Sequence, residues 1–225
     1  MRGLNRFFIS FFVLFSVTGI VNAQNSDFNL WTSFSIEKRI IKDLDFEIEI
    51  DNRLKNNLQM RDETLADIGL KYSPNPFAFS VVYRITNVNK GDSRYVIGNR
   101  FTYQAEFQQE IKRFTLELRA KYQDHYEAFL TSEDGRIPES FIRTRGKLEY
   151  NIKGIPLDPF ISFESFLRFN SYTQKQVEKE RYSFGASYKL NKKNAVGFVF
   201  HYQKEINIAE PDRDYILALK YSFEL

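Results

Sequence analysis

The sequence predicts an all-β fold, an antiparallel, up-and-down transmembrane β-barrel of 10–12 strands. Apolar and polar residues alternate through most of the chain, which is the pattern of strands with one apolar face. Aromatic residues make up 16% of the chain, yet 27% of its residues are charged and its mean hydropathy is -0.44. A bundle of membrane helices would not be this polar, whereas the strands of a barrel direct half of their side chains into a polar interior. A third observation is the apolar, aromatic strand on which the chain ends.

The first 23 residues are predicted to be a signal peptide that is cleaved after export across the inner membrane. Arg2 and Arg6 supply a positive start, residues 7–20 form an apolar run, and Val21-Asn22-Ala23 resembles a cleavage site. An uncleaved anchor is the alternative, but the run is shorter than the roughly 20 residues that a spanning helix needs. Residues 24–225 then form a single barrel domain. Loss of the two arginines leaves 30 basic and 29 acidic residues (32 minus 2, against 29), so the charge does not point to nucleic acid.

Residues 215–225 form the clearest strand of the sequence. Every odd position is apolar, and Ile216 is the one large apolar residue among the even positions. Strands that cross a membrane are about 9–11 residues long. Transmembrane barrels commonly end on a strand of this kind, so we expect an outer-membrane location, with outer-membrane lipid and the barrel-assembly machinery as partners. The apolar positions are Tyr215, Leu217, Leu219, Tyr221, Phe223 and Leu225.

Four segments in the first 90 residues show the same alternation. Trp31 falls on the polar face of the first segment, and prolines 74 and 76 mark a turn because proline cannot continue a strand ladder. The segments, with their apolar faces, are 28–40 (Phe28, Leu30, Phe34, Ile36, Ile40), 44–54 (Leu44, Phe46, Ile48, Ile50), 64–72 (Ala66, Ile68, Leu70, Tyr72) and 77–85 (Phe77, Phe79, Val81, Tyr83, Ile85).

The second half of the chain adds the segment 215–225 and six others. They are 95–107 (Tyr95, Ile97, Phe101, Tyr103, Phe107), 114–122 (Phe114, Leu116, Leu118, Ala120, Tyr122), 142–150 (Ile142, Leu148, Tyr150), 161–169 (Ile161, Phe163, Leu167, Phe169), 182–190 (Tyr182, Phe184, Ala186, Tyr188, Leu190) and 196–202 (Val196, Phe198, Phe200, Tyr202). Aromatic residues near segment ends, as an interfacial girdle requires, are Tyr72, Phe77, Tyr150, Phe160 and Tyr188. A single alternating segment is weak evidence, but a series of eleven favours a barrel.

The connections alternate between short and long, as periplasmic turns and extracellular loops do in outer-membrane barrels. We expect short turns at 42–43, 73–76, 108–110, 153–158 and 191–194, and longer connections at 55–61, 88–92, 124–138, 170–178 and 206–212. Segment 124–138 is the predicted main outer loop. Eleven is an odd number, whereas bacterial barrels are normally even. Either residues 28–41 are a plug or two short strands, or one strand is not recognised, and the prediction therefore stays at 10–12.

The inner face is expected to carry charges of both signs. A barrel of this size has a narrow interior that side chains can fill, and buried charges need partners. The sequence therefore predicts a structural barrel stiffened by salt bridges, or else a narrow pore whose arginines favour small anions. The predicted network consists of Glu47, Glu49, Arg53, Arg84, Arg100, Glu117, Arg119, Arg143, Arg145, Glu164, Arg168 and Arg181.

The sequence leaves two other functions open. A barrel-embedded lipid hydrolase or acyltransferase would need a nucleophile, and Ser183 or Ser187 near His201 is the one candidate, although no spacing singles it out. A soluble periplasmic β-protein that binds an apolar ligand is the second alternative. The chain has no cysteine, and it has no metal-binding or cofactor-binding motif. We therefore expect no enzyme and no cofactor, and the sequence specifies no oligomeric state.

Short motifs through nearly the whole mature chain resemble the domain-of-unknown-function family 2490, uncharacterised outer-membrane proteins of Gram-negative bacteria. The motifs are Trp31, Asp51-Asn-Arg53, Gly69-Leu-Lys-Tyr72, Val82-Tyr-Arg84, Arg143-Thr-Arg145, Pro159-Phe-Ile-Ser-Phe-Glu164, and Arg181 with Gly185. Each is unspecific, and their order carries the resemblance. Val82 stands where a glycine is expected before the Tyr-Arg pair. The resemblance implies an outer-membrane barrel and supplies no activity or catalytic residues.

Overall fold

The computed structural model describes residues 26–91, 94–127, 138–169 and 176–225. The predicted signal peptide and most of the predicted main loop at 124–138 lie outside these residues. Among the described residues no helix is long and apolar enough to cross a membrane. The strands are β1 (Ser26–Ile41), β2 (Leu44–Lys55), β3 (Met60–Tyr72), β4 (Phe77–Asn89), β5 (Tyr95–Ile111), β6 (Phe114–Glu127), β7 (Glu139–Tyr150), β8 (Leu157–Arg168), β9 (Gln176–Lys189), β10 (Asn194–Glu205) and β11 (Arg213–Glu224).

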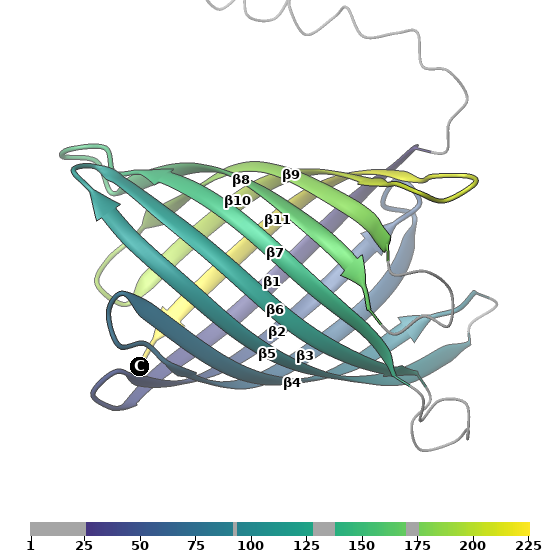
Figure 1. The fold of residues 1–225 in the computed structure, drawn as a ribbon, viewed down its shortest axis with the longest axis horizontal. Helices are drawn as coiled ribbons and strands as arrows, with labels where there is room; N and C mark the ends of the chain where they lie inside the picture. The colour runs from purple at the N-terminus through teal and green to yellow at the C-terminus, as the bar shows by residue number, and fades with distance from the viewer. Residues whose placement is uncertain (1–25, 92–93, 128–137, 170–175) are drawn as a thin grey trace, which may run out of the picture.

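The eleven strands form one closed barrel in which each strand pairs with its neighbours in sequence (Figure 1). Ten pairs are antiparallel, as predicted, but β1 and β11 pair in parallel from Ser26 opposite Arg213 to Glu37 opposite Glu224. The prediction of a wholly antiparallel barrel is therefore wrong at the β1–β11 pair, which we call the parallel seam. In an up-and-down series with an odd number of strands the first and last run in the same direction, so they can close the barrel only in parallel. Residues 28–41 are thus one wall strand, neither a plug nor two short strands.

The two faces of the wall have opposite chemistry. Large apolar side chains cover the outside, where Ile68 is 51% exposed, Phe198 48% and Leu219 43%. Among the described residues, the buried apolar set is Leu65, Ala78 and Ile216, whereas twelve buried residues are polar or charged. A water-soluble sandwich has an apolar core, so this distribution is inverted relative to one. The pairing register explains it, because every strand directs its apolar set to one side.

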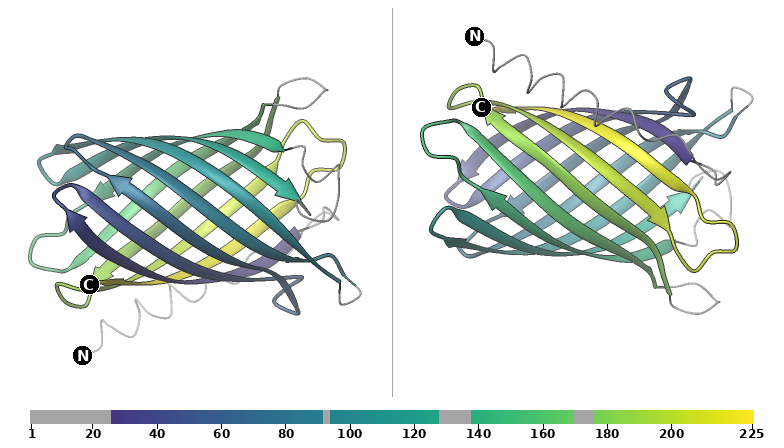
Figure 2. Two further views of the ribbon diagram at one scale, coloured as in Figure 1. Left: turned by 90° about the horizontal axis from the view of Figure 1, so that it is seen from below. Right: turned by 90° about the horizontal axis from the view of Figure 1, so that it is seen from above.

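Successive connections alternate between the two ends of the barrel (Figure 2). Short turns join β1 to β2 and β5 to β6 at one end, which we call the turn side. The end that holds the β2–β3, β4–β5 and β10–β11 connections is the loop side. The predicted turn at 108–110 is wrong, because β5 continues to Ile111 and the reversal occurs at Lys112, whose φ is 60°. Likewise residues 124–127 belong to β6.

Candidate functional site

A cluster around Glu164 occupies the lumen. Glu164 lies on β8, is 4% exposed, and accepts a hydrogen bond from Arg119 Nη2 at 2.6 Å. Arg143 donates to both carboxylate oxygens, with Nη2 at 2.9 Å and Nε at 3.2 Å, and Arg181 Nη1 lies 3.7 Å from Oε2. The three arginines come from β6, β7 and β9, so one carboxylate joins four strands from the inside. We call these four residues the Glu164 cluster.

Neutral amides satisfy part of the remaining donor capacity in the Glu164 cluster. Gln203 Oε1 accepts from Arg181 Nε at 3.0 Å and Nη2 at 2.5 Å, and Gln123 Oε1 accepts from Arg143 Nη1 at 3.2 Å. The cluster thus holds three positive charges against one negative charge in a space with little solvent. The carboxylate contributes more to the stability of the cluster than any single arginine, because all three guanidinium groups interact with it.

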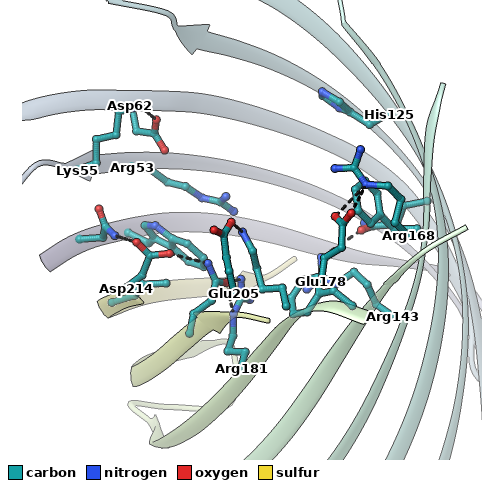
Figure 3. Close-up of a pocket in the computed structure, with 18 of the residues that line it drawn as sticks. Arg53, Lys55, Asp62, His125, Arg143, Arg168, Glu178, Arg181, Glu205 and Asp214 are labelled. Carbon is teal, nitrogen blue, oxygen red and sulfur yellow. Dashed lines mark hydrogen bonds and ion pairs between the residues drawn. The ribbon is translucent and has the colours of Figure 1, made fainter. Parts of the chain in front are cut away.

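A cavity of about 550 Å³ lies on the loop side of the Glu164 cluster. Side chains from different parts of the wall, including Arg53, Arg143, Arg168 and Glu178, extend into it (Figure 3). Arg168 donates from Nε to Glu178 at 2.8 Å and lies 3.4 Å from Glu139. We call this space the loop-side cavity.

A second cavity, of about 390 Å³, lies on the turn side and shares no lining residue with the first. Here Arg84 pairs with Asp67 through two contacts of 2.5 Å, and Lys220 pairs with Glu49 at 2.5 Å. Arg119 lines this cavity, whereas Arg143 and Arg181 line the loop-side cavity. The Glu164 cluster therefore lies between the two spaces.

Inside the lumen, Trp31 contacts arginines from strands on both sides of the parallel seam. The guanidinium carbon of Arg53, on β2, lies 4.0 Å from the ring centroid, and that of Arg181, on β9, lies 5.0 Å from it. Cations over an indole face are attracted by its quadrupole. Because Trp31 belongs to β1 while Arg181 lies on the far side of β10 and β11, this contact spans the closure of the barrel. On the outside, Phe34 and Tyr221 stack across the same seam with centroids 5.7 Å apart.

The structure distributes the twelve predicted residues over several local pairings. Arg119, Arg143, Glu164 and Arg181 form the Glu164 cluster, and Arg145 pairs with Glu117 farther toward the turn side. Arg53 pairs with Asp51 at 3.0 Å and with Glu63 at 2.5 Å. Glu47 lines the turn-side cavity, and Arg100 lines the loop-side cavity. Phe160, assigned to the girdle from the sequence, instead faces the lumen, with Lys147 Nζ 4.7 Å from its ring centroid.

Sequence reasoning did not select several partners in this network, among them Glu63, Asp67 and Lys220. Alternation places all three on the polar face, but the choice of partner depends on strand register. The seam adds to this difficulty, since Lys220 reaches Glu49 across β1. The structural importance of Trp31 has one sequence signal, which is its place on a face that otherwise carries polar residues.

Ser183 and His201 are brought together, as the hydrolase alternative requires, with Oγ 2.7 Å from Nδ1. The pair faces the lumen and not the outer surface, and Ser183 is buried. Neither residue lines the loop-side or turn-side cavity, and among the described residues no carboxylate hydrogen-bonds to His201. The described residues also contain no group of three His, Asp or Glu side chains that could hold a metal ion.

A comparison with protein-family models identifies the family of the chain. The family model described as a protein of unknown function, DUF2490, matches residues 28–214, which run from β1 into β11. A search of curated proteins finds no match. The matched range covers the wall that contains the Glu164 cluster, and it confirms the resemblance drawn from the ordered motifs.

Proposed function

The chain belongs to the DUF2490 family of proteins of unknown function, and on this premise we propose that it is a structural outer-membrane β-barrel of a Gram-negative bacterium with an occluded lumen. The supporting observation is the inverted distribution of side chains. The buried residues are mainly polar, and large apolar side chains surround the wall. An exposed apolar surface of this extent is stable where lipid covers it. The predicted signal peptide supplies the route of export.

Migration on an unheated detergent gel tests the proposed location. A lipid-embedded barrel resists mild detergent, so the unheated protein is expected to migrate differently from the boiled protein. It is also expected to fractionate with the outer membrane and to need detergent for extraction. A mature chain that dissolves without detergent and migrates identically before and after boiling would support the soluble apolar-ligand protein instead.

The Glu164 cluster favours the structural role over the narrow pore. An open path would need the three arginines to leave the carboxylate, which costs several kcal/mol in a buried network. Planar bilayers that contain the wild-type barrel are therefore expected to show no steady conductance. A steady, anion-selective current would replace the structural role by the pore.

The terminal strand β11 is the segment through which we propose that the barrel-assembly machinery engages the chain. Its outward residues include Tyr215, Leu219 and Tyr221, each at least 37% exposed, and it closes the wall by pairing with β1. Replacing Tyr221 and Phe223 by serine is expected to lower the amount of folded barrel in cells while purified variants still refold in detergent. Equal amounts in cells would count against this partner.

We propose no catalytic function. The Ser183–His201 pair faces the lumen, where a lipid substrate on the outer wall does not reach it. Lipase and acyltransferase assays are expected to give the same background for the wild type and for His201→Ala. Activity that the substitution abolishes would establish the hydrolase or acyltransferase alternative.

A further inference from the structure

Arg100, in the wall of the loop-side cavity, is a cation without a partner among the residues that the structure describes. It lies on β5, and among the described residues its guanidinium makes no ion pair and no hydrogen bond. Its cross-strand neighbours are Arg84 and His125, neither of which is acidic. Arg84 is itself engaged by Asp67 through both carboxylate oxygens. The side chain is therefore placed beside like charge with no carboxylate opposite it.

The other charged groups that line this cavity all have partners. Arg53, Lys55, Arg168 and Lys179 are paired with carboxylates, and Arg143 and Arg181 belong to the Glu164 cluster. Two lining carboxylates have no cation partner within the described part of the chain and accept hydrogen bonds instead: Asp27 from the backbone amides of Asn56 and Asn57, and Asp214 from Asn29 and Gln203. No carboxylate among the described lining residues is thus left for Arg100.

From this imbalance we propose that the loop-side cavity binds a small oxyanion, a phosphate or carboxylate group, at Arg100. A cation held away from bulk water without a counter-charge is unfavourable, and an anion from solution removes that cost. The planar guanidinium presents donors in a fork that matches the two oxygens of a phosphate or carboxylate. The cavity of about 550 Å³ has room for the organic part of such a solute.

His125 supplies a second unused polar group at the same place. Its Nδ1 is buried and has no hydrogen-bond partner among the described residues, and His125 pairs with Arg100 in the β5–β6 register. Rotation of the imidazole toward the cavity, in the tautomer that carries a proton on Nδ1, would let it donate to an oxyanion held by the neighbouring guanidinium. Both groups line the loop-side cavity. The site needs only the folded lumen, so it goes beyond the proposed location and does not depend on it.

Calorimetric titration of the folded full-length barrel in detergent tests the proposal. Inorganic phosphate and acetate are the probes, at constant ionic strength, with choline as a cationic control. The wild type is expected to bind phosphate, and Arg100→Gln to bind it roughly tenfold to a hundredfold more weakly, because charge-assisted hydrogen bonds are lost. Arg168→Gln is the matched control, since Arg168 lines the same cavity but is already paired, and its affinity is expected to stay within about threefold of wild type.

Three results would overturn the site: no binding of either anion by the wild type, equal affinity in Arg100→Gln, or an equal loss in Arg168→Gln. The last would show that only the general positive potential matters. If Arg100→Gln does not fold, Arg100→Lys decides. It keeps the charge but loses the fork, so weaker phosphate binding than wild type supports the site and unchanged binding contradicts it. A barrel that binds phosphate in detergent yet is absent from the outer membrane would refute the location alone.

Discussion

Glu164→Gln is the substitution that most directly probes the lumen of the barrel. The amide keeps the size of the side chain but removes the carboxylate charge that Arg119, Arg143 and Arg181 share. Breaking a buried pair by removing one partner costs about 3–5 kcal/mol, since the other charge is left uncompensated. Glutamine still accepts one hydrogen bond, so we expect the free energy of unfolding to fall by roughly 3 kcal/mol.

The matched control for Glu164→Gln is Glu139→Gln. Glu139 also pairs with an arginine, but its side chain is 55% exposed and the contact to Arg168 is 3.4 Å. An exposed pair of this kind contributes about 0–1 kcal/mol. Urea unfolding in lipid vesicles, followed by the fluorescence of Trp31, which is the single tryptophan of the chain, measures both variants. Equal losses in the two variants, or a change below about 0.5 kcal/mol for Glu164→Gln, would refute the reasoning.

Three further predictions concern the wall. Gly185→Ala is expected to destabilise the barrel by about 1–3 kcal/mol, because an added Cβ would lie 2.5 Å from the Phe198 carbonyl oxygen. Gly197→Ala is the control: the nearest atom to its added Cβ lies at 3.8 Å, so it should have no effect in the same unfolding assay. Trp31→Leu removes both cation–π contacts and should lower the free energy of unfolding by about 2 kcal/mol. The barrel should then change its gel mobility at a lower temperature than the wild type, and an unchanged temperature would contradict the role of Trp31 in stabilising the β1–β11 pair. Ile68→Arg should cost about 2–4 kcal/mol in bilayers if its outward face meets lipid, and a neutral effect would contradict that position.

Most of the wall could be predicted from the sequence, because the alternation of apolar and polar residues is a local property of each strand and can be recognised without knowing which strands pair. All eleven expected segments are strands, and the outward sets include Ile68, Phe198 and Leu219 as expected. The ends were harder to predict. Gln108, Gln109 and Glu110 suggest a turn by their polarity, yet β5 simply continues beyond the apolar zone there. Where both faces of a strand contact water, apolar and polar residues no longer alternate, so the sequence pattern does not show where the strand ends.

The pairing of the lumen could not be predicted for a different reason. Which carboxylate pairs with which arginine depends on the strand register and on how the barrel closes, and neither can be predicted from the sequence of a single strand. Glu164 lies directly opposite Arg145 in the β7–β8 register, yet it binds Arg119 and Arg143 while Arg145 turns to Glu117. The parallel seam likewise follows from the total number of strands, which is a property of the whole chain.

The position of lipid relative to the wall can be measured with single cysteine labels, because the chain has no cysteine of its own. Leu70 and Lys71 are consecutive residues of β3, so their side chains point to opposite faces of the wall; Leu70 is 48% exposed on the outside, and Lys71 faces the lumen. Fluorophores attached after Leu70→Cys and Lys71→Cys are compared in vesicles with nitroxide-labelled lipid and with a water-soluble quencher. We expect the lipid nitroxide to quench the label at position 70 and the aqueous quencher to reach the label at position 71. Aqueous quenching at position 70 with no effect of the lipid nitroxide would contradict an apolar wall that faces the membrane.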